Sequence, residues 1–159
     1  MERLFRPWRA AYVTGPKDEG CFLCEAFSAG DDRAYLVVAR GVAAATVLNK
    51  YPYNNGHLMV APLRHLDDMG ELSIEERAEV MDLVVRSIDA LRASMDPDGF
   101  NVGANLGRVA GAGLPGHLHL HVVPRWGGDT NFMPVIGDTK VLPESLEETY
   151  ERLRERFGS

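Results

Sequence analysis

Three histidines alternate with apolar residues in the segment 116–128, which reads GHLHLHVVPRWGG. Successive side chains of a β-strand point to opposite faces, so this pattern predicts a strand with His117, His119 and His121 on one face and an apolar row on the other. Neighbouring imidazoles of such a face lie about 7 Å apart, so one bound group could touch all three. The rest of the chain has only two histidines, His57 and His65. The segment therefore predicts a functional face, with a merely solvated strand face as the alternative.

The composition predicts one globular domain. Of the 159 residues, 45% are hydrophobic and 25% are charged, which suits a single core. The net charge of -6 argues against binding nucleic-acid polymers through a basic surface. No apolar run approaches the ~20 residues of a membrane span, and the N-terminus lacks the apolar stretch of a secretory signal. We therefore expect a soluble cytoplasmic protein with no membrane partner.

Hydrophobic spacing predicts an α+β fold. Short apolar runs typical of strands occupy 31–41, 43–49, 57–62, 100–105 and 118–125. The first two are expected to form a hairpin that turns at Arg40 and Gly41. A long helix divides the strands, which favours an antiparallel or mixed sheet with helices packed on it over a doubly wound sheet.

Two capping boxes mark the predicted helices. From Ser73 to Met95, apolar residues recur every three or four positions, which predicts a long amphipathic helix. Ser73 and Glu76 form the capping box at its start. A second box, Ser145 with Glu148, predicts a final helix over 146–157.

A glycine-rich loop, NLGRVAGAGLPG, precedes the histidine segment. It lacks the Gly-Lys-Ser/Thr of a Walker A motif and leads into a strand rather than a helix. Its position favours close approach of phosphate oxygens to backbone N–H groups, with a simple connection as the alternative.

The Cys-x-x-Cys motif GCFLC is compatible with several kinds of chemistry. Such pairs serve redox, zinc and iron–sulfur sites. A thioredoxin-like role needs a surrounding βαβ unit, which the pattern does not offer. Two thiolates and two imidazoles would complete a structural zinc site, and metal-free reduced thiols remain the alternative.

The residues resemble the histidine triad superfamily of nucleotide hydrolases and transferases. HLHLHVV is similar to its alternating triad, NNGHLMVAPLRH to its Gly-His strand and Pro-x-x-His corner, and CFLC to the zinc motif of many bacterial members. The resemblance runs from about Phe5 to the end of the chain. The tail VVPRWGGDTNFMPVIG is closer to the branch of bacterial diadenosine tetraphosphate phosphorylases and hydrolases.

This resemblance implies a five-stranded antiparallel sheet with one long and one C-terminal helix, paired in a homodimer. A single domain would span 1–159, with a zinc segment at 1–30, a sheet and helix core at 31–126, and a C-terminal extension and helix at 127–159. It also implies one structural zinc per protomer, held by Cys21, Cys24, His65 and His117.

The resemblance implies cleavage of dinucleoside polyphosphates, such as diadenosine tetraphosphate, at the α-phosphorus. His119 matches the nucleophile that forms a nucleotidyl-histidine intermediate, His121 and His57 match phosphate-contacting histidines, and His117 completes the triad. The acceptor is water or phosphate. Substrate contacts are expected from Asn49 at the ribose, Asn105 near the phosphates, backbone N–H groups of Gly113 or Leu114, Arg125, and Trp126 at a base. For the asparagines and Trp126, ordinary turn hydrogen bonding and core packing are the alternatives.

One departure from the family concerns the loop before the triad, where many members have Ser or Thr and this chain has GAGLPG. The missing hydroxyl predicts a preference for polyphosphate leaving groups, which depart as stable anions, over amines. Two other functions stay open. The histidine triplet could bind a catalytic zinc in a metallohydrolase, or the pocket could bind nucleotides without turnover.

Overall fold

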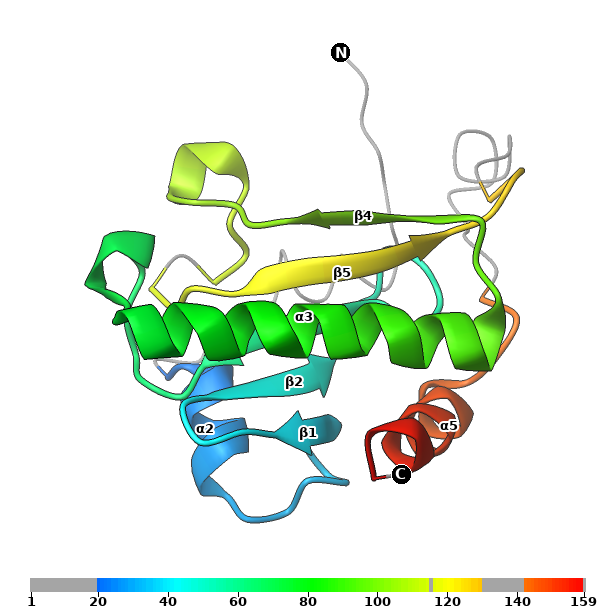
Figure 1. The fold of residues 1–159 in the computed structure, drawn as a ribbon, viewed down its shortest axis with the longest axis horizontal. Coiled ribbons are helices and arrows are strands. Elements are labelled where there is room, and N and C mark those ends of the chain that lie inside the picture. Colours follow the sequence, from blue (N-terminus) through cyan, green and yellow to red (C-terminus); the bar gives the residue numbers. More distant parts are fainter. Residues whose placement is uncertain (1–19, 115, 130–141, 159) are drawn as a thin grey trace.

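Five antiparallel strands form one sheet in the order β1-β2-β3-β5-β4, as Figure 1 shows. The computed structural model describes residues 20–114, 116–129 and 142–158. The strands are β1 Val37–Arg40, β2 Ala44–Leu48, β3 Leu58–Pro62, β4 Gly99–Gly103 and β5 Leu120–Arg125. The predicted α+β class and five-stranded antiparallel sheet are confirmed.

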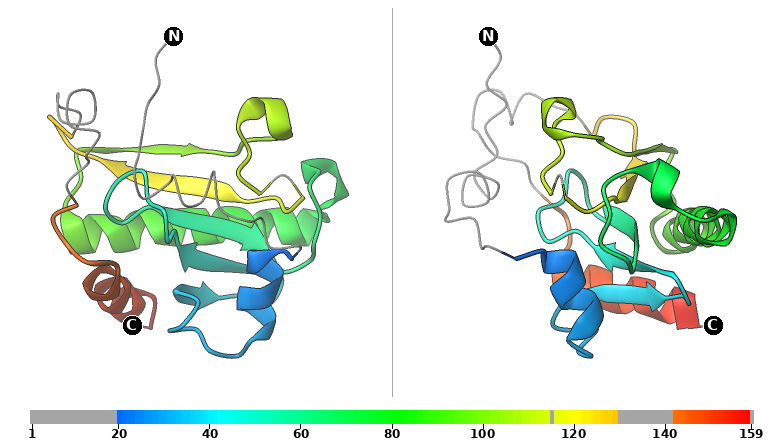
Figure 2. Two further views of the ribbon diagram at one scale, coloured as in Figure 1. Left: turned by 180° about the vertical axis from the view of Figure 1, so that it is seen from behind. Right: turned by 90° about the vertical axis from the view of Figure 1, so that its left-hand side faces the viewer.

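Helices cover the two faces of the sheet unequally. Helix α3, Ile74–Met95, runs across one face with α5, Leu146–Gly158, beside it (Figure 1). A short helix, α2 Phe22–Ser28, lies on the opposite face (Figure 2). The larger apolar core lies under α3 and α5, and the smaller one joins Leu23 of α2 to Val47 and Met59 of the sheet. The opposite face is thus only partly covered by α2.

Both predicted capping boxes are present. The Ser73 side chain accepts the N–H of Glu76, and the Glu76 carboxylate accepts the N–H of Ser73 at 2.8 Å. Ser145 and Glu148 exchange the same pair of bonds. Helix α3 ends at Met95 because Asp96 takes a left-handed conformation with φ of 46°. The expected limits of the long helix are confirmed.

The strands are shorter than the sequence predicts. The run 31–41 pairs only from Val37, because the Asp31 carboxylate accepts the N–H of Ala34 and forms a turn. The run 118–125 pairs only from Leu120, because the N–H of Leu118 donates to the carbonyl of Leu66 at 2.6 Å. These start points correct the predicted boundaries, and the runs 57–62 and 100–105 shift to 58–62 and 99–103.

Among residues 20–114, 116–129 and 142–158, three short helices were not predicted. They are α2, η1 Met69–Glu71 and η2 Arg108–Ala110. In α2 the buried Leu23 and Ala26 are three positions apart, a helical spacing too brief to stand out beside the cysteines. Within the described residues, no helix is both long and apolar enough to cross a membrane. Parts of the predicted terminal segments, 1–19 and 130–141, lie outside the described residues.

Candidate active site and metal centre

Three histidines meet on the face of the sheet opposite α3. His121 lies in β5, paired with Met59 of β3 on one side and Gly103 of β4 on the other. His57 immediately precedes β3, and its ring centroid lies 5.0 Å from that of His121. The ring centroid of His119 lies 4.9 Å from that of His121. Strand pairing therefore brings His57 next to residues more than 60 positions further along the chain.

Backbone contacts fix the proton of His57. This residue is fully buried, and its Nδ1 lies 3.0 Å from the N–H of Tyr53 and 3.3 Å from the side-chain amide of Asn49. A backbone N–H only donates, so Nδ1 accepts and the proton of the neutral ring is on Nε2. That Nε2 lies 2.9 Å from Nδ1 of His121. His57 therefore donates to His121, and the proton of neutral His121 is on its own Nε2.

His119 has the opposite tautomer. Its Nδ1 lies 2.8 Å from the carbonyl oxygen of His117, which only accepts, so Nδ1 carries the proton. The lone pair is then on Nε2, and none of the described residues hydrogen-bonds to that atom. Adjacent rings thus present a nucleophilic nitrogen on His119 and an N–H donor on His121.

A second group contains Cys21, Cys24, His65 and His117. Its four ligand atoms lie within 4.8 Å of one another. Nδ1 of His117 is 3.1 Å from Sγ of Cys21, and Nδ1 of His65 is 3.3 Å from Sγ of Cys24. Tetrahedral zinc, with bonds of about 2.3 Å to sulfur and 2.0 Å to nitrogen, places its ligands at such separations. The donor set and its spacing fit zinc.

His117 is neutral and oriented for this group. Its Nε2 donates to the carbonyl of Pro62 at 2.8 Å, which leaves the lone pair on Nδ1, toward the cysteines. Burial is the main cause that lowers the pKa of His117, which favours the uncharged ring that a metal requires. Both nitrogens are engaged, so the structure separates His117 from the ring pair His119 and His121. The strand pattern allows all three imidazoles to touch one bound group, but in the structure the ring of His117 contacts Cys21 and Pro62 instead.

Several predicted substrate residues make intramolecular contacts. Asn49 accepts the N–H of Tyr51 at 2.9 Å as well as contacting His57. Asn105 contacts the carbonyl of Gly111 at 3.4 Å. The indole of Trp126 donates to the carbonyl of Met95 at 3.4 Å, which places it at the end of α3. Leu114 packs beside the smaller core.

A groove of about 450 Å³ adjoins His121 and is lined by β4, β5 and the turn that contains Tyr53 and Asn54. It contains a polar network that sequence reasoning missed, made by Asn54, Asn101, Arg125 and Asp129. Arg125 pairs with both carboxylate oxygens of Asp129, at 2.6 and 2.8 Å, and donates to Asn101 at 2.6 Å. Asn54, in the turn before His57, was visible only as turn chemistry, and nothing local marked Asp129. Predicted Arg125 therefore lines the groove with its charge balanced by Asp129.

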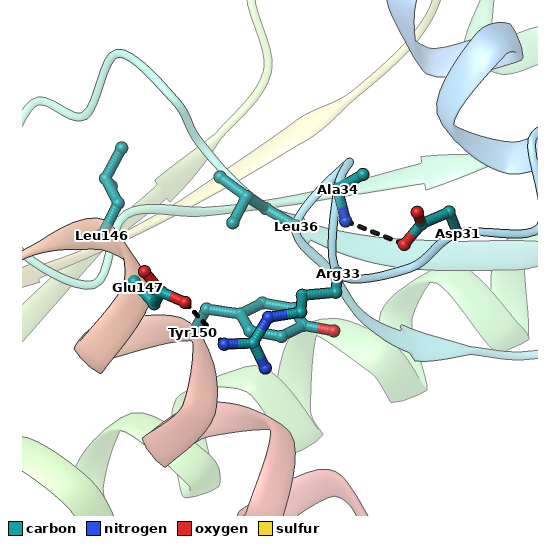
Figure 3. Close-up of a pocket in the computed structure, with 7 residues that line it drawn as sticks. All are labelled: Asp31, Arg33, Ala34, Leu36, Leu146, Glu147 and Tyr150. Carbon is teal, nitrogen blue, oxygen red and sulfur yellow. Dashed lines mark hydrogen bonds and ion pairs between the residues drawn. The ribbon is translucent and has the colours of Figure 1, made fainter.

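A second groove, of about 420 Å³, lies between the turn before β1 and the start of α5 (Figure 3). Arg33 crosses it and pairs with Glu147 and Glu151. None of the sequence-predicted site residues lines it.

The fold and the two histidine groups define a histidine triad domain. The family model described as the HIT domain matches residues 36–128, which is more than half of the chain, and the chain belongs to this family. It is 51% identical over 118 residues to the Mycobacterium tuberculosis protein named AP-4-A phosphorylase, covering 74% of this chain and 60% of that protein. The chain therefore spans about three fifths of the length of these relatives.

Other relatives agree on the family. A HIT-like protein from Saccharolobus solfataricus is 31% identical, covering 82% of this chain and 90% of the relative. A zinc-bound histidine triad family protein from Mycobacterium smegmatis superposes with a TM-score of 0.71 at 26% identity, covering 87% of this chain and 94% of the other.

Proposed function

We propose that the chain cleaves dinucleoside polyphosphates, such as diadenosine tetraphosphate, at the α-phosphorus through a nucleotidyl-histidine intermediate on His119. The main support for this proposal is the pair of tautomers of His119 and His121. His119 presents an Nε2 lone pair because its Nδ1–H is bonded to the carbonyl of His117, while His121 presents an Nε2–H because His57 donates to its Nδ1. A nucleophile beside a hydrogen-bond donor is what in-line attack on a phosphoryl group needs.

In the first step, Nε2 of His119 forms a bond to the α-phosphorus and the bond to the bridging oxygen breaks. For diadenosine tetraphosphate the leaving group is ATP, which departs as an anion without a proton. The ring becomes a phosphorylated imidazolium whose Nδ1–H still donates to the carbonyl of His117 at 2.8 Å. Nε2–H of His121 donates to a non-bridging oxygen and stabilises its developing charge.

In the second step, an oxygen nucleophile attacks the same phosphorus and neutral His119 leaves. Water gives AMP, and inorganic phosphate gives ADP. The relative named AP-4-A phosphorylase supports phosphate as the acceptor. Asn105 and the backbone of Gly113 and Leu114 are the proposed partners of the other phosphate oxygens, with Asn49 at the ribose and Arg125 and Trp126 toward the second nucleotide.

The Cys21, Cys24, His65 and His117 group is the proposed site of one structural zinc per protomer. A metal bound there would tie α2, the segment after β3 and the segment before β5 together. The named zinc-bound relative from Mycobacterium smegmatis supports this assignment. The two thiolates would cancel the charge of the ion.

We also propose a homodimer. Strand β4 is an edge of the sheet, and its residues 101–103 are exposed. Natural proteins rarely leave such an edge unprotected, and pairing with a second copy would cover it.

The metallohydrolase alternative has little support in the geometry. His117 is directed at the cysteines, so the triplet does not supply three ligands to one ion. In the described parts of the chain, the only group of three or more His, Cys, Asp or Glu that could hold a metal is the one with both cysteines. Two alternatives remain, an enzyme that cleaves nucleotides and a protein that only binds them. Formation of products distinguishes the two.

The test is mass spectrometry of the products from diadenosine tetraphosphate, with and without inorganic phosphate. The proposal predicts ATP in both cases, with AMP from water and ADP from phosphate. Symmetric cleavage to ADP alone without phosphate, or binding without turnover, would overturn it.

A further inference from the structure

The segment that carries the nucleophile lies outside the strand pairing. Strand β5 begins at Leu120, so residues 117–119 have no ladder of their own. The N–H of Leu118 donates to the carbonyl of Leu66 at 2.6 Å, and the N–H of His117 donates to the carbonyl of Leu114 at 3.3 Å. The position of His119 therefore depends on contacts with two loops.

His117 connects the Cys₂His₂ group to His119. Its Nδ1 faces Sγ of Cys21 at 3.1 Å, and its Nε2 donates to Pro62 at 2.8 Å. Its carbonyl oxygen accepts Nδ1–H of His119 at 2.8 Å. The same residue thus belongs to the metal group through its ring and orients the nucleophile through its backbone.

A second connection runs through His65. This ligand is followed by Leu66, whose carbonyl holds Leu118. Leu66 and Leu118 are buried together with Leu72 in a small apolar cluster. One of the four metal-group residues, His65, is therefore adjacent in sequence to a backbone group that holds this segment, and a second, His117, lies within the segment.

We propose that His117 is a positioning residue that couples zinc occupancy of this group to the orientation of His119; the inference rests on the nucleophilic role proposed above. With zinc bound, both nitrogens of His117 are fixed and its carbonyl has one direction. Without zinc, Nδ1 faces only thiols, which are weak hydrogen-bond partners, and the ring can turn or change tautomer. The carbonyl of His117 then no longer holds the proton of His119 on Nδ1 or fixes the orientation of its ring.

A small displacement of His119 is expected to lower the rate of turnover strongly. A misplacement of about 1 Å at a reacting group can lower a rate about 100-fold. We therefore expect turnover per folded molecule to fall about 10- to 100-fold when zinc is removed, even though the metal lies outside the ring pair His119 and His121.

The test is ¹⁵N NMR of the histidine side chains in the full chain, with zinc and after its removal. In the zinc-loaded protein we expect a single Nδ1–H tautomer of His119. After removal we expect its signals to broaden or average between tautomers, while those of His57, held by the N–H of Tyr53, stay unchanged. Signals of His119 that do not respond to zinc would overturn the proposal, whatever the activity.

Two variants separate positioning from general destabilisation. Cys24→Ser should change His119 as zinc removal does. Leu153→Ala, which opens the core under α5, should destabilise the chain without altering the His119 tautomer. If the zinc-free chain does not fold, cadmium replaces zinc. Its larger radius should shift the His119 signals and leave those of His57, and unchanged His119 signals there would overturn the coupling.

The coupling and the proposed function fail separately. The spectra report on His119 without any nucleotide. Normal turnover by His119→Ala would overturn the proposed nucleophilic role of His119. The NMR spectra would still show whether zinc controls the tautomer of His119.

Discussion

The side-chain amide of Asn54 donates to Oδ2 of Asp129 at 2.8 Å and to the carbonyl of Pro124 at 3.0 Å. These bonds fasten the turn that precedes His57 to the end of β5, the strand that contains His121. The turn also contains Tyr53, whose N–H sets the tautomer of His57. Asn54 therefore supports the donor state of His121 through the turn that holds His57.

Replacing Asn54 with Ala should lower both stability and kcat. The change removes two hydrogen bonds, one to the buried carbonyl of Pro124 and one to the Asp129 carboxylate, which together stabilise the fold by about 1–3 kcal/mol. Denaturant unfolding measures the first effect and steady-state kinetics the second. Ser94→Ala is a control, since the buried Ser94 hydroxyl has no hydrogen-bond partner among the residues that the structure describes and its loss should be neutral. Equal behaviour of the two variants would contradict the role of Asn54.

His57→Ala should lower kcat about 100-fold or more, because His121 then loses the donor that places its proton on Nε2. His57→Gln should retain more activity than the Ala variant, since an amide N–H can donate from nearly the same place. Comparison of kcat for the two folded variants checks this order. If the kcat of His57→Gln is no higher than that of His57→Ala, the hydrogen bond from Nε2–H of His57 does not contribute to catalysis.

The sequence was most informative where structure is local. The helix over 74–95 follows from apolar spacing and the Ser73–Glu76 cap, which involve neighbours in the chain. The alternating histidines predicted a strand, but pairing begins only at Leu120 because Leu66, more than 50 positions earlier, takes the N–H of Leu118. Such long-range competition has no local signature.

The candidate site also has features that could be expected from the sequence and features that could not. The Cys₂His₂ group was expected from resemblance, and the structure brings its four residues together. The tautomers could not be read from sequence, because they depend on the carbonyl of His117 and the N–H of Tyr53 as the fold presents them. The Asn54–Asp129 contact joins residues 75 positions apart, and neither residue type is unusual in a loop.

Glu76 should contribute to the free energy of unfolding at neutral pH and lose this contribution in acid. Hydrogen bonds from Arg64 and from the N–H of Ser73 lower its pKa from 4.5 to about 2. A carboxyl group with a lowered pKa stabilises the folded state above its unfolded pKa, and this stabilisation is lost as the pH falls from about 4.5 to about 2. Glu76→Gln should flatten the dependence of unfolding free energy on pH in that range. A slope retained in Glu76→Gln would contradict the assignment.

The loop before His117 should set the preference for leaving groups. It offers no hydroxyl to protonate an amine, and general acid catalysis contributes about 10²-fold or more. Diadenosine tetraphosphate should therefore have a kcat/KM about 100-fold or more above that of an adenosine phosphoramidate. Parallel assays of the two substrates measure the ratio, and equal values would show that another donor protonates the leaving group.

Rapid quench with radiolabelled diadenosine tetraphosphate is the direct test of a covalent intermediate on His119. We expect label bound to the wild-type protein within one turnover to be acid-labile and to map to the peptide containing His119. We expect His119→Ala neither to retain label nor to turn over substrate. Near-normal turnover by His119→Ala, or label mapped to another residue, would contradict it.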